Sequence, residues 1–208
     1  MVKKMNYLKY LVEEIHTVIM ATVDSDNHPV CCAIDLMDYD ENGLYFLTAK
    51  GKKFYERLTQ NNYVSLTGIK GDNTLSSISV SICGKVREIG SQPLEKLFKK
   101  NSYMNEFYPT EKCQHALTVF QIYEGNGEWF DLSVKPIQRD TFTFGNAEKK
   151  SFRYSINSNC QGCKLCSTVC PQNCIDYSSH VATIIQKNCL HCGNCLTVCP
   201  HNAIIKGD

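Results

Sequence analysis

The feature that most constrains this chain is a cysteine spacing that occurs twice near its carboxyl end. Cysteines stand at positions 160, 163, 166 and 170, and again at 189, 192, 195 and 199, so each run reads Cys-x2-Cys-x2-Cys-x3-Cys-Pro. The two runs align over 16 positions at an offset of 29, and 9 of these positions are identical. Cysteines clustered at short, fixed spacings favour a metal site over a disulfide scaffold, and soft, anionic thiolates suit iron.

The duplicated run resembles that of bacterial two-cluster ferredoxins, over about residues 153–208. In such proteins the fourth cysteine of each run ligates the cluster of the other run, so the resemblance implies two [4Fe–4S] clusters. The first cluster would be held by Cys160, Cys163, Cys166 and Cys199. The second would be held by Cys189, Cys192, Cys195 and Cys170. Zinc and disulfide bonds are the alternative interpretations of these cysteines.

Cys174 is the ninth cysteine of this segment, and it aligns with Ala203 of the second run. We therefore predict that Cys174 fills a small apolar slot and is not a ligand. His191 and His201 lie inside the runs, but eight thiolates already satisfy the iron. We expect both histidines to pack or to face solvent.

The composition of the 208-residue chain bounds its partners. Lys plus Arg is 22 and Asp plus Glu is 21, a formal charge of +1, which gives no electrostatic reason to bind nucleic acid or an anionic membrane. No segment approaches the about 20 consecutive apolar residues of a membrane span. The first residues lack an uninterrupted apolar stretch and a cleavage site, so we expect a cytoplasmic protein, where thiols stay reduced. Composition changes near Lys149, which predicts domains at 1–148 and 149–208.

The first domain is expected to consist mainly of antiparallel strands with peripheral helices. Residues 6–15 and 51–60 have helical apolar periodicity, and Pro93 opens a third helix. Strands are expected at 17–23, 30–37, 44–48, 63–69 and 77–89. Gly125-Asn-Gly127 separates the apolar runs 117–123 and 128–132, which indicates a hairpin. Strands at this spacing favour an antiparallel barrel.

The order of these elements resembles the pyridoxamine 5'-phosphate oxidase-like, FMN-binding split-barrel superfamily over about residues 6–132, most sharply over Tyr45 to Leu66. The resemblance implies a mainly β split barrel, fused here to a small α+β ferredoxin-like domain. It also implies FMN at the interface of a homodimer. The FMN phosphate would be bound by residues after the third strand: Thr48, Lys50, Lys52 and Lys53. A phosphate needs several donors and positive charge, although a solvated lysine-rich turn is the alternative interpretation.

The same resemblance places Cys32, Ala33 and Ile34 against the flavin ring and adds Ser79 to the cofactor-binding residues. The oxidases that name the superfamily carry Arg in place of Cys32, and an Arg-Gln pair in place of Ile78 and Ser79. These differences argue against pyridoxamine phosphate oxidation. The four cysteines of this domain are expected to be buried small residues: Cys31, Cys32, Cys83 and Cys113.

Together these features predict an FMN-dependent oxidoreductase with a built-in ferredoxin, acting with an electron-donor or electron-acceptor protein. The alternative is an electron carrier or redox sensor whose split barrel serves for docking or dimerisation. No catalytic residue follows from the sequence, because the histidines at 16, 28, 115 and 180 form no recognisable catalytic grouping.

Overall fold

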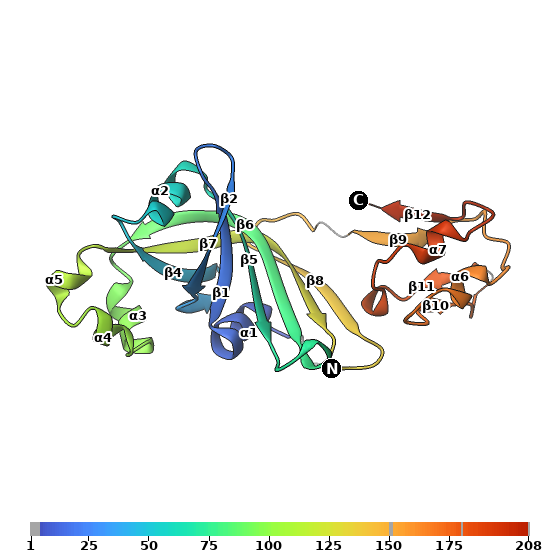
Figure 1. Ribbon diagram of the computed structural model, residues 1–208, viewed down its shortest axis with the longest axis horizontal. Coiled ribbons are helices and arrows are strands. Elements are labelled where there is room, and N and C mark those ends of the chain that lie inside the picture. The colour runs from blue at the N-terminus through green and yellow to red at the C-terminus, as the bar shows by residue number, and fades with distance from the viewer. Residues whose placement is uncertain (1–4, 150–151, 180, 208) are drawn as a thin grey trace. The chain divides into compact units, whose positions relative to one another are not determined.

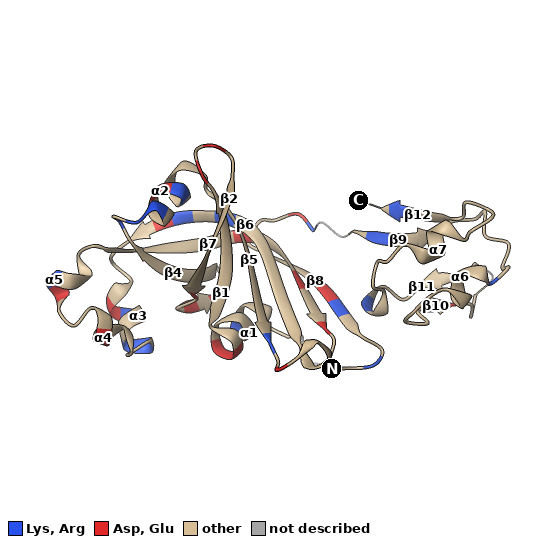
Figure 2. Cartoon of the chain, in the orientation of Figure 1, with Lys and Arg blue, Asp and Glu red and all other residues tan. Residues whose placement is uncertain are grey.

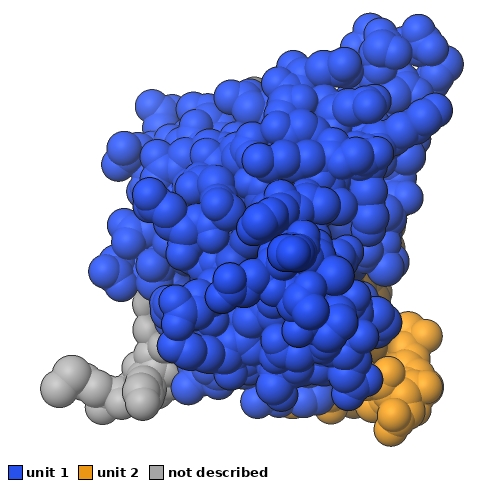
Figure 3. All heavy atoms as spheres, turned by 90° about the vertical axis from the view of Figure 1, so that its left-hand side faces the viewer, with its two compact units in different colours: residues 1–70, 79–129, 142–148 blue, residues 71–78, 130–141, 149–208 orange. Residues whose placement is uncertain are grey.

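The computed structural model describes residues 5–149, 152–179 and 181–207. The chain forms two compact units, coloured separately in Figure 3. The first comprises Met1–Lys70, Ser79–Trp129 and Phe142–Glu148, and the second comprises Gly71–Ile78, Phe130–Thr141 and Lys149–Asp208. The domain boundary at residue 149 stays a prediction.

The first unit is built on an eight-stranded sheet (Figure 1). Its strands are β1 (Thr17–Val23), β2 (Pro29–Asp35), β3 (Asp38–Asp40), β4 (Gly43–Ala49), β5 (Tyr63–Lys70), β6 (Ile78–Gly90), β7 (Leu117–Asp131) and β8 (Gln138–Phe144). They are ordered β2-β1-β5-β6-β7-β4-β3, with β8 paired to β7. The expectation of a mainly antiparallel β domain with helices is confirmed.

Short helices border this sheet. They are α1 (Tyr7–Tyr10), which continues as the π-helix η1 (Leu11–Ile15), then α2 (Lys53–Gln60), α3 (Leu94–Lys100), α4 (Met104–Phe107) and α5 (Glu111–Gln114). The 3₁₀ helix η2 (Thr74–Ser76) lies in a segment of the second unit. No helix among the described residues is long and apolar enough to cross a membrane.

The core of the first unit lies on one face of each strand, because successive strand residues point to opposite faces. Phe46 of β4 and Phe120 of β7 are fully buried, and their rings stack with centroids 5.7 Å apart. Helix α2 covers them with Phe54 and Leu58, which are 6% and 2% exposed. This packing holds the loop before α2 against the end of β4.

The predicted hairpin at Gly125–Gly127 is wrong, because β7 runs unbroken from Leu117 to Asp131 and pairs with β8 beyond it. A Cβ at Gly127 would lie 2.2 Å from the Phe142 ring, and a Cβ at Gly125 would lie 2.9 Å from the Phe144 ring. These glycines therefore admit aromatic rings of β8 instead of turning the chain. The strand predicted at 30–37 ends at Asp35, and β3 follows it.

The carboxyl-terminal part of the second unit is built from two copies of one small motif. Its elements are β9 (Arg153–Ile156), α6 (Leu165–Thr168), β10 (Ile175–Asp176), β11 (Thr183–Ile184), the 3₁₀ helix η3 (Gln186–Asn188), α7 (Asn194–Thr197) and β12 (Ile204–Gly207). Strand β12 pairs with β9, and β10 pairs with β11.

The repeat extends to the backbone conformation. Positive φ angles recur at an offset of 29: 64° at Lys164 and 79° at Gly193, and 48° at both Asn173 and Asn202. The loop between β7 and β8 belongs to this unit, because the carbonyl of Ile137 accepts a hydrogen bond from the Asn188 side chain at 2.8 Å.

Candidate metal centres and cofactor site

The structure brings each predicted cysteine quartet into the lining of one cavity. Cavity I is lined by the first quartet: Cys160, Cys163, Cys166 and Cys199. Cavity II is lined by the second quartet: Cys170, Cys189, Cys192 and Cys195. In each cavity, three cysteines come from one run and the fourth comes from the other.

The spacing of the sulfurs fits a cluster better than a single ion. Among the described residues, no three cysteine sulfurs lie within 4.8 Å of one another. A tetrahedral zinc site, with Zn–S bonds near 2.3 Å, requires its sulfurs to lie about 3.8 Å apart. As they lie in the structure, the sulfurs of each quartet are therefore too far apart for one tetrahedral zinc ion.

Backbone N–H groups point at the fourth cysteine of each run. The N–H of Cys174 donates to the Sγ of Cys170 at 3.4 Å, and the N–H of Ala203 donates to the Sγ of Cys199 at 3.3 Å. Burial alone would raise the pKa of Cys199, but the N–H groups of Ala203 and its neighbours outweigh burial and lower this pKa. Such donors favour the thiolate form that iron requires.

Cys174 is buried, with 3% of its surface exposed, as predicted for a small slot, and its counterpart Ala203 is 1% exposed. Its Sγ also lies 3.4 Å from that of Cys170. A hydrogen bond from the Cys174 thiol is the largest cause that lowers the pKa of Cys189 to about 6. Cys174 thus lines cavity II as a thiol beside two of its cysteines.

Tyr177 lies at cavity I and was not identified from the sequence. Its hydroxyl is 3.0 Å from the Sγ of Cys166, and burial and this contact raise the pKa of Tyr177 to about 12. The sequence signal was slight, because Tyr177 lies between the two runs and outside the repeated motif.

The predicted phosphate-binding residues lie on β4 and at the start of α2 (lysines blue in Figure 2). Thr48 is 3% exposed, and its hydroxyl has no hydrogen-bond partner among the described residues. Lys52 and Lys53 are exposed at the first turn of α2, which has no side-chain cap. Lys50 instead lines a separate cavity of the first unit, together with Glu95 and other residues. An orphaned hydroxyl, uncapped N–H groups and ammonium groups together fit a phosphate.

Arg57 is a cation of α2 that sequence reasoning missed. Its Nε donates to the Thr22 hydroxyl at 2.7 Å. Burial raises the pKa of Cys32 on β2, whereas the charges of Arg57 and Lys52 act to lower it, so both cations lie near Cys32. Arg57 follows Lys53 by four residues on one helix face, which was the available signal.

The remaining predicted flavin contacts lie on two strands. Cys32 pairs with Met20 and Ala33 pairs with Ile19, so the side chains of Cys32 and Ala33 point to opposite faces of β2, and Ile34 shares the face of Cys32. Ser79 lies on β6, separated from β2 by β1 and β5. The structure therefore does not bring all the predicted residues together within one chain.

One face of strands β2, β1, β5 and β6 is accessible and carries no charged side chain at its centre. We call it the neutral sheet face, formed by Ile19, Cys31, Ala33, Ser65, Thr67, Ser81 and Cys83. Ile19 is 54% exposed, and the Thr67 and Ser81 hydroxyls are 2.9 Å apart. The prediction that Cys31, Cys83 and Cys113 are buried is wrong, because all three are exposed. Strand alternation turns Cys31 and Cys83 away from the core.

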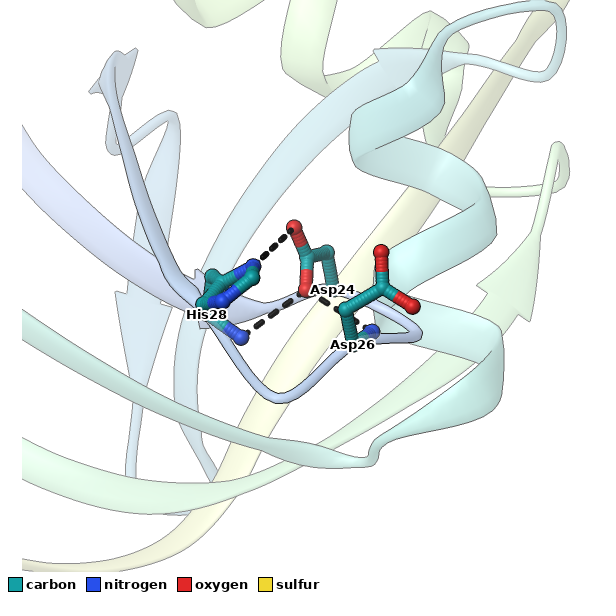
Figure 4. A group of neighbouring side chains, drawn as sticks. All are labelled: Asp24, Asp26 and His28. Carbon is teal, nitrogen blue, oxygen red and sulfur yellow. Dashed lines mark hydrogen bonds and ion pairs between the residues drawn. The ribbon is translucent and has the colours of Figure 1, made fainter.

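Two further polar groupings lie in the first unit. Figure 4 shows Asp24, Asp26 and His28 in the loop between β1 and β2, where Asp24 accepts the backbone N–H groups of Asp26 and His28 at 3.0 and 2.9 Å. These bonds close the turn, so we assign no ligand there. Elsewhere, the Tyr103 hydroxyl contacts His16 Nε2 and Asp35 Oδ2, both at 2.9 Å. This grouping joins residues far apart in sequence, and we assign it no catalytic role.

The fold and the cavities define a mainly antiparallel β domain with helices and a small cysteine-rich carboxyl-terminal domain, and comparison with known families agrees. Residues 7–124 match the family described as pyridoxamine 5'-phosphate oxidase, and residues 159–203 match the 4Fe-4S dicluster domain. The chain belongs to the pyridoxamine 5'-phosphate oxidase family and carries a 4Fe-4S dicluster domain at its carboxyl-terminal end. No curated protein matches it.

Solved structures similar to the chain share the fold of its first unit. A NimC/NimA family protein from Clostridium acetobutylicum is 16% identical, with a TM-score of 0.54 over 64% of this chain and 87% of that one. A heme binding protein from Mycobacterium smegmatis is 10% identical, with a TM-score of 0.51 over 68% of this chain and 60% of that one. At these identities, the likeness establishes the fold alone.

Proposed function

We propose that the chain is an FMN- and iron–sulfur-dependent oxidoreductase that passes electrons between two [4Fe–4S] clusters and a flavin to reduce a substrate or partner. One observation carries the proposal: the same chain contains two cysteine-lined cavities and a β domain of the pyridoxamine 5'-phosphate oxidase family. Clusters carry single electrons and flavin handles one or two, so the pair links single-electron supply to two-electron chemistry.

Cavity I would hold one cluster through its four cysteines, and cavity II would hold the other. The FMN phosphate would be held by the Thr48 hydroxyl, the uncapped start of α2, and the cations Lys52, Lys53 and Arg57. This arrangement is supported by the orphaned Thr48 hydroxyl and by the absence of a side-chain cap on α2. Charge-assisted contacts of this kind favour FMN over riboflavin, which lacks the phosphate.

A homodimer is supported by the neutral sheet face. Ile19 on this face is 54% exposed, and Ile69, which lies on β5, is 65% exposed. Exposed apolar side chains in a surface without central charges are typical of a protein interface. A second copy of the chain would cover this face and bring its own Ser79 to the assembly.

An electron-donor protein with an acidic docking face is supported by cations beside cavity II. Arg139, Arg153 and Lys187 line one open cavity of the second unit, and Arg139 Nη1 donates to the Cys189 carbonyl at 3.5 Å. Opposite charge steers weak electron-transfer partners together, and such steering weakens as salt rises. Reduction by an acidic carrier such as flavodoxin should therefore become slower as ionic strength rises. In Lys187→Ala, the reduction rate should depend less on ionic strength than in the parent.

Anaerobic purification followed by iron, sulfide, zinc and cofactor analysis tests the proposal. We expect about eight iron and eight sulfide per chain, together with extractable FMN. Zinc without sulfide would contradict the cluster assignment. A protein with clusters but an empty barrel would favour the electron carrier or redox sensor instead. If haem is extracted in place of flavin, the flavin assignment is wrong, and the ligand is of the kind named for the mycobacterial protein of similar fold.

The double variant Lys52→Ala, Lys53→Ala tests the phosphate assignment. Loss of one charge-assisted contact costs about 1.5–3 kcal/mol, or roughly 10- to 150-fold in affinity, so the variant should be flavin-poor with its clusters intact. Folding should persist, because both side chains are exposed. Lys112→Ala, at an exposed lysine of α5, is the matched control. Equal binding of riboflavin and FMN by the parent protein would refute the assignment.

A further inference from the structure

Each cavity has one side-chain donor that the other lacks. At cavity I the Tyr177 hydroxyl is 3.0 Å from the Sγ of Cys166. At cavity II the Cys174 thiol is 3.4 Å from the Sγ of Cys170. A cysteine that holds iron is a thiolate and can only accept, so in the loaded protein Tyr177 and Cys174 are the donors.

The internal repeat shows that these donors are not equivalent. The residue 29 positions after Tyr177 is Lys206, whose ammonium lies 5.0 Å from the Phe152 ring centroid. Tyr154 lines cavity II, yet among the described residues no hydrogen bond joins its hydroxyl to a cysteine sulfur. The tyrosine–thiolate contact is thus a property of cavity I only.

The two donors differ in strength. A phenol O–H is a strong donor, and its contact with Cys166 is short, whereas a thiol S–H is a weak donor. Reduction adds negative charge to the cluster and its thiolates, so a hydrogen bond to sulfur is stronger in the reduced state. Hydrogen bonding to the sulfurs therefore raises a cluster's reduction potential.

Burial and charge act in the same direction. Cys189 and Cys195 of cavity II are 7% and 9% exposed, whereas each cysteine of cavity I is more exposed than that. Burial disfavours the added charge of the reduced cluster and lowers its potential. Cavity I also has a nearby cation, Lys164, whose ammonium lies 5.7 Å from the Tyr177 ring, where the second run has Gly193.

Two features of cavity II oppose this difference, but their contacts are longer. The backbone N–H of His191 donates to the Sγ of Cys189 at 3.4 Å. Arg139 donates to the Cys189 carbonyl at 3.5 Å and so brings a positive charge close to this cysteine. The proposal therefore requires the 3.0 Å hydroxyl contact at Cys166 to outweigh these two features, and the order of the two potentials measures this directly.

We propose that the hydroxyl of Tyr177 raises the potential of the cluster in cavity I above that of the cluster in cavity II, so that an electron reaching the second domain rests at cavity I. This proposal rests on the proposed function for the presence of the two clusters. In this account Tyr177 determines which cluster holds the electron, and the cluster of cavity II passes the electron on.

Anaerobic redox titration of the full holoprotein, followed by electron paramagnetic resonance, tests this assignment. We expect two separate potentials, and we expect Tyr177→Phe to lower only the higher one, by about tenfold in the reduction equilibrium, or about 59 mV for one electron. Tyr154→Phe should move neither potential, and Cys174→Ala should lower only the lower one, by less. An unchanged higher potential in Tyr177→Phe, or a shift of the lower potential instead, would overturn the proposal.

Hyperfine spectroscopy gives a second test that compares the parent with Tyr177→Phe. In the parent, the higher-potential cluster should couple to an exchangeable proton that disappears in deuterated buffer and is missing from Tyr177→Phe, whereas the backbone N–H couplings remain in both proteins. Identical exchangeable couplings at this cluster in the two proteins would overturn the assignment. A protein that contains no clusters would instead contradict the proposed function, so the two failures are distinguishable.

Discussion

The buried hydroxyl of Thr48 gives a prediction with opposite signs for stability and for binding. Thr48 on β4 lies directly opposite Thr118 on β7, and both are buried. The Thr118 hydroxyl donates to the Glu88 carboxylate at 2.6 Å, whereas the Thr48 hydroxyl has no partner among the described residues. Valine has the shape of threonine and lacks the hydroxyl, so Thr48→Val and Thr118→Val each remove one of these two hydroxyl groups.

The magnitudes follow from burial. An unpaired buried hydroxyl costs about 1–3 kcal/mol, so Thr48→Val should raise the free energy of unfolding of the flavin-free protein by about 1 kcal/mol. If this hydroxyl donates to the FMN phosphate, the same change removes a charge-assisted bond and weakens FMN binding roughly 10- to 150-fold. Thr118→Val should instead destabilise the protein by about 1.5–3 kcal/mol and leave FMN affinity unchanged.

Denaturant unfolding followed by fluorescence of Trp129 measures the first effect, because this is the only tryptophan of the chain and is buried in the first unit. Equilibrium titration with FMN measures the second. A Thr48→Val protein that is less stable without flavin would refute the argument that the hydroxyl is unsatisfied. A Thr48→Val protein with parental FMN affinity would refute its role at the phosphate.

Three further predictions concern the clusters and the pH dependence of stability. Cys170→Ser should cost the protein the cluster of cavity II and leave that of cavity I, as iron analysis and electron paramagnetic resonance will show, because ligation crosses between the runs. Cys174→Ala should retain both clusters, and loss of either would make Cys174 a ligand. Burial alone would raise the pKa of Asp38, but hydrogen bonds from Lys100 and Lys96, at 2.5 and 2.8 Å, outweigh it and lower this pKa. Because the folded pKa is the lower one, the stabilisation is present above the unfolded value of about 3.9 and is lost as pH falls through the folded value. Unfolding measured against pH should show this loss in the parent and not in Asp38→Asn, and equal acid sensitivity of the two would contradict it.

The features predicted well from the sequence are those that local spacing determines. The resemblance of the cysteine runs to ferredoxins implied two quartets with crossed membership. Cys170 and Cys199 line the cavities of the opposite runs, and their ligation of clusters stays a prediction. The strands predicted at 17–23 and 44–48 likewise match β1 and β4 to within a residue.

The features that were missed depend on contacts across the fold. Gly127 has the local appearance of a turn, but its role is to admit the Phe142 ring from the neighbouring strand. The contacts of Arg57 with Thr22 and of Tyr177 with Cys166 depend on tertiary packing, which the sequence does not show directly. The exposure of Cys31 depends on which face of the sheet the rest of the fold leaves uncovered, which sequence alone does not determine.

The central claim, that clusters and flavin exchange electrons within this chain, is tested most directly by anaerobic rapid mixing of the holoprotein with a one-electron donor that reacts slowly with free FMN. The flavin absorbance is followed in the parent and in the double variant Cys163→Ser, Cys192→Ser, which removes one ligand from each cavity. The account predicts prompt bleaching of the flavin band in the parent and little bleaching in the variant at equal flavin occupancy. Bleaching at the same rate in both proteins would contradict it.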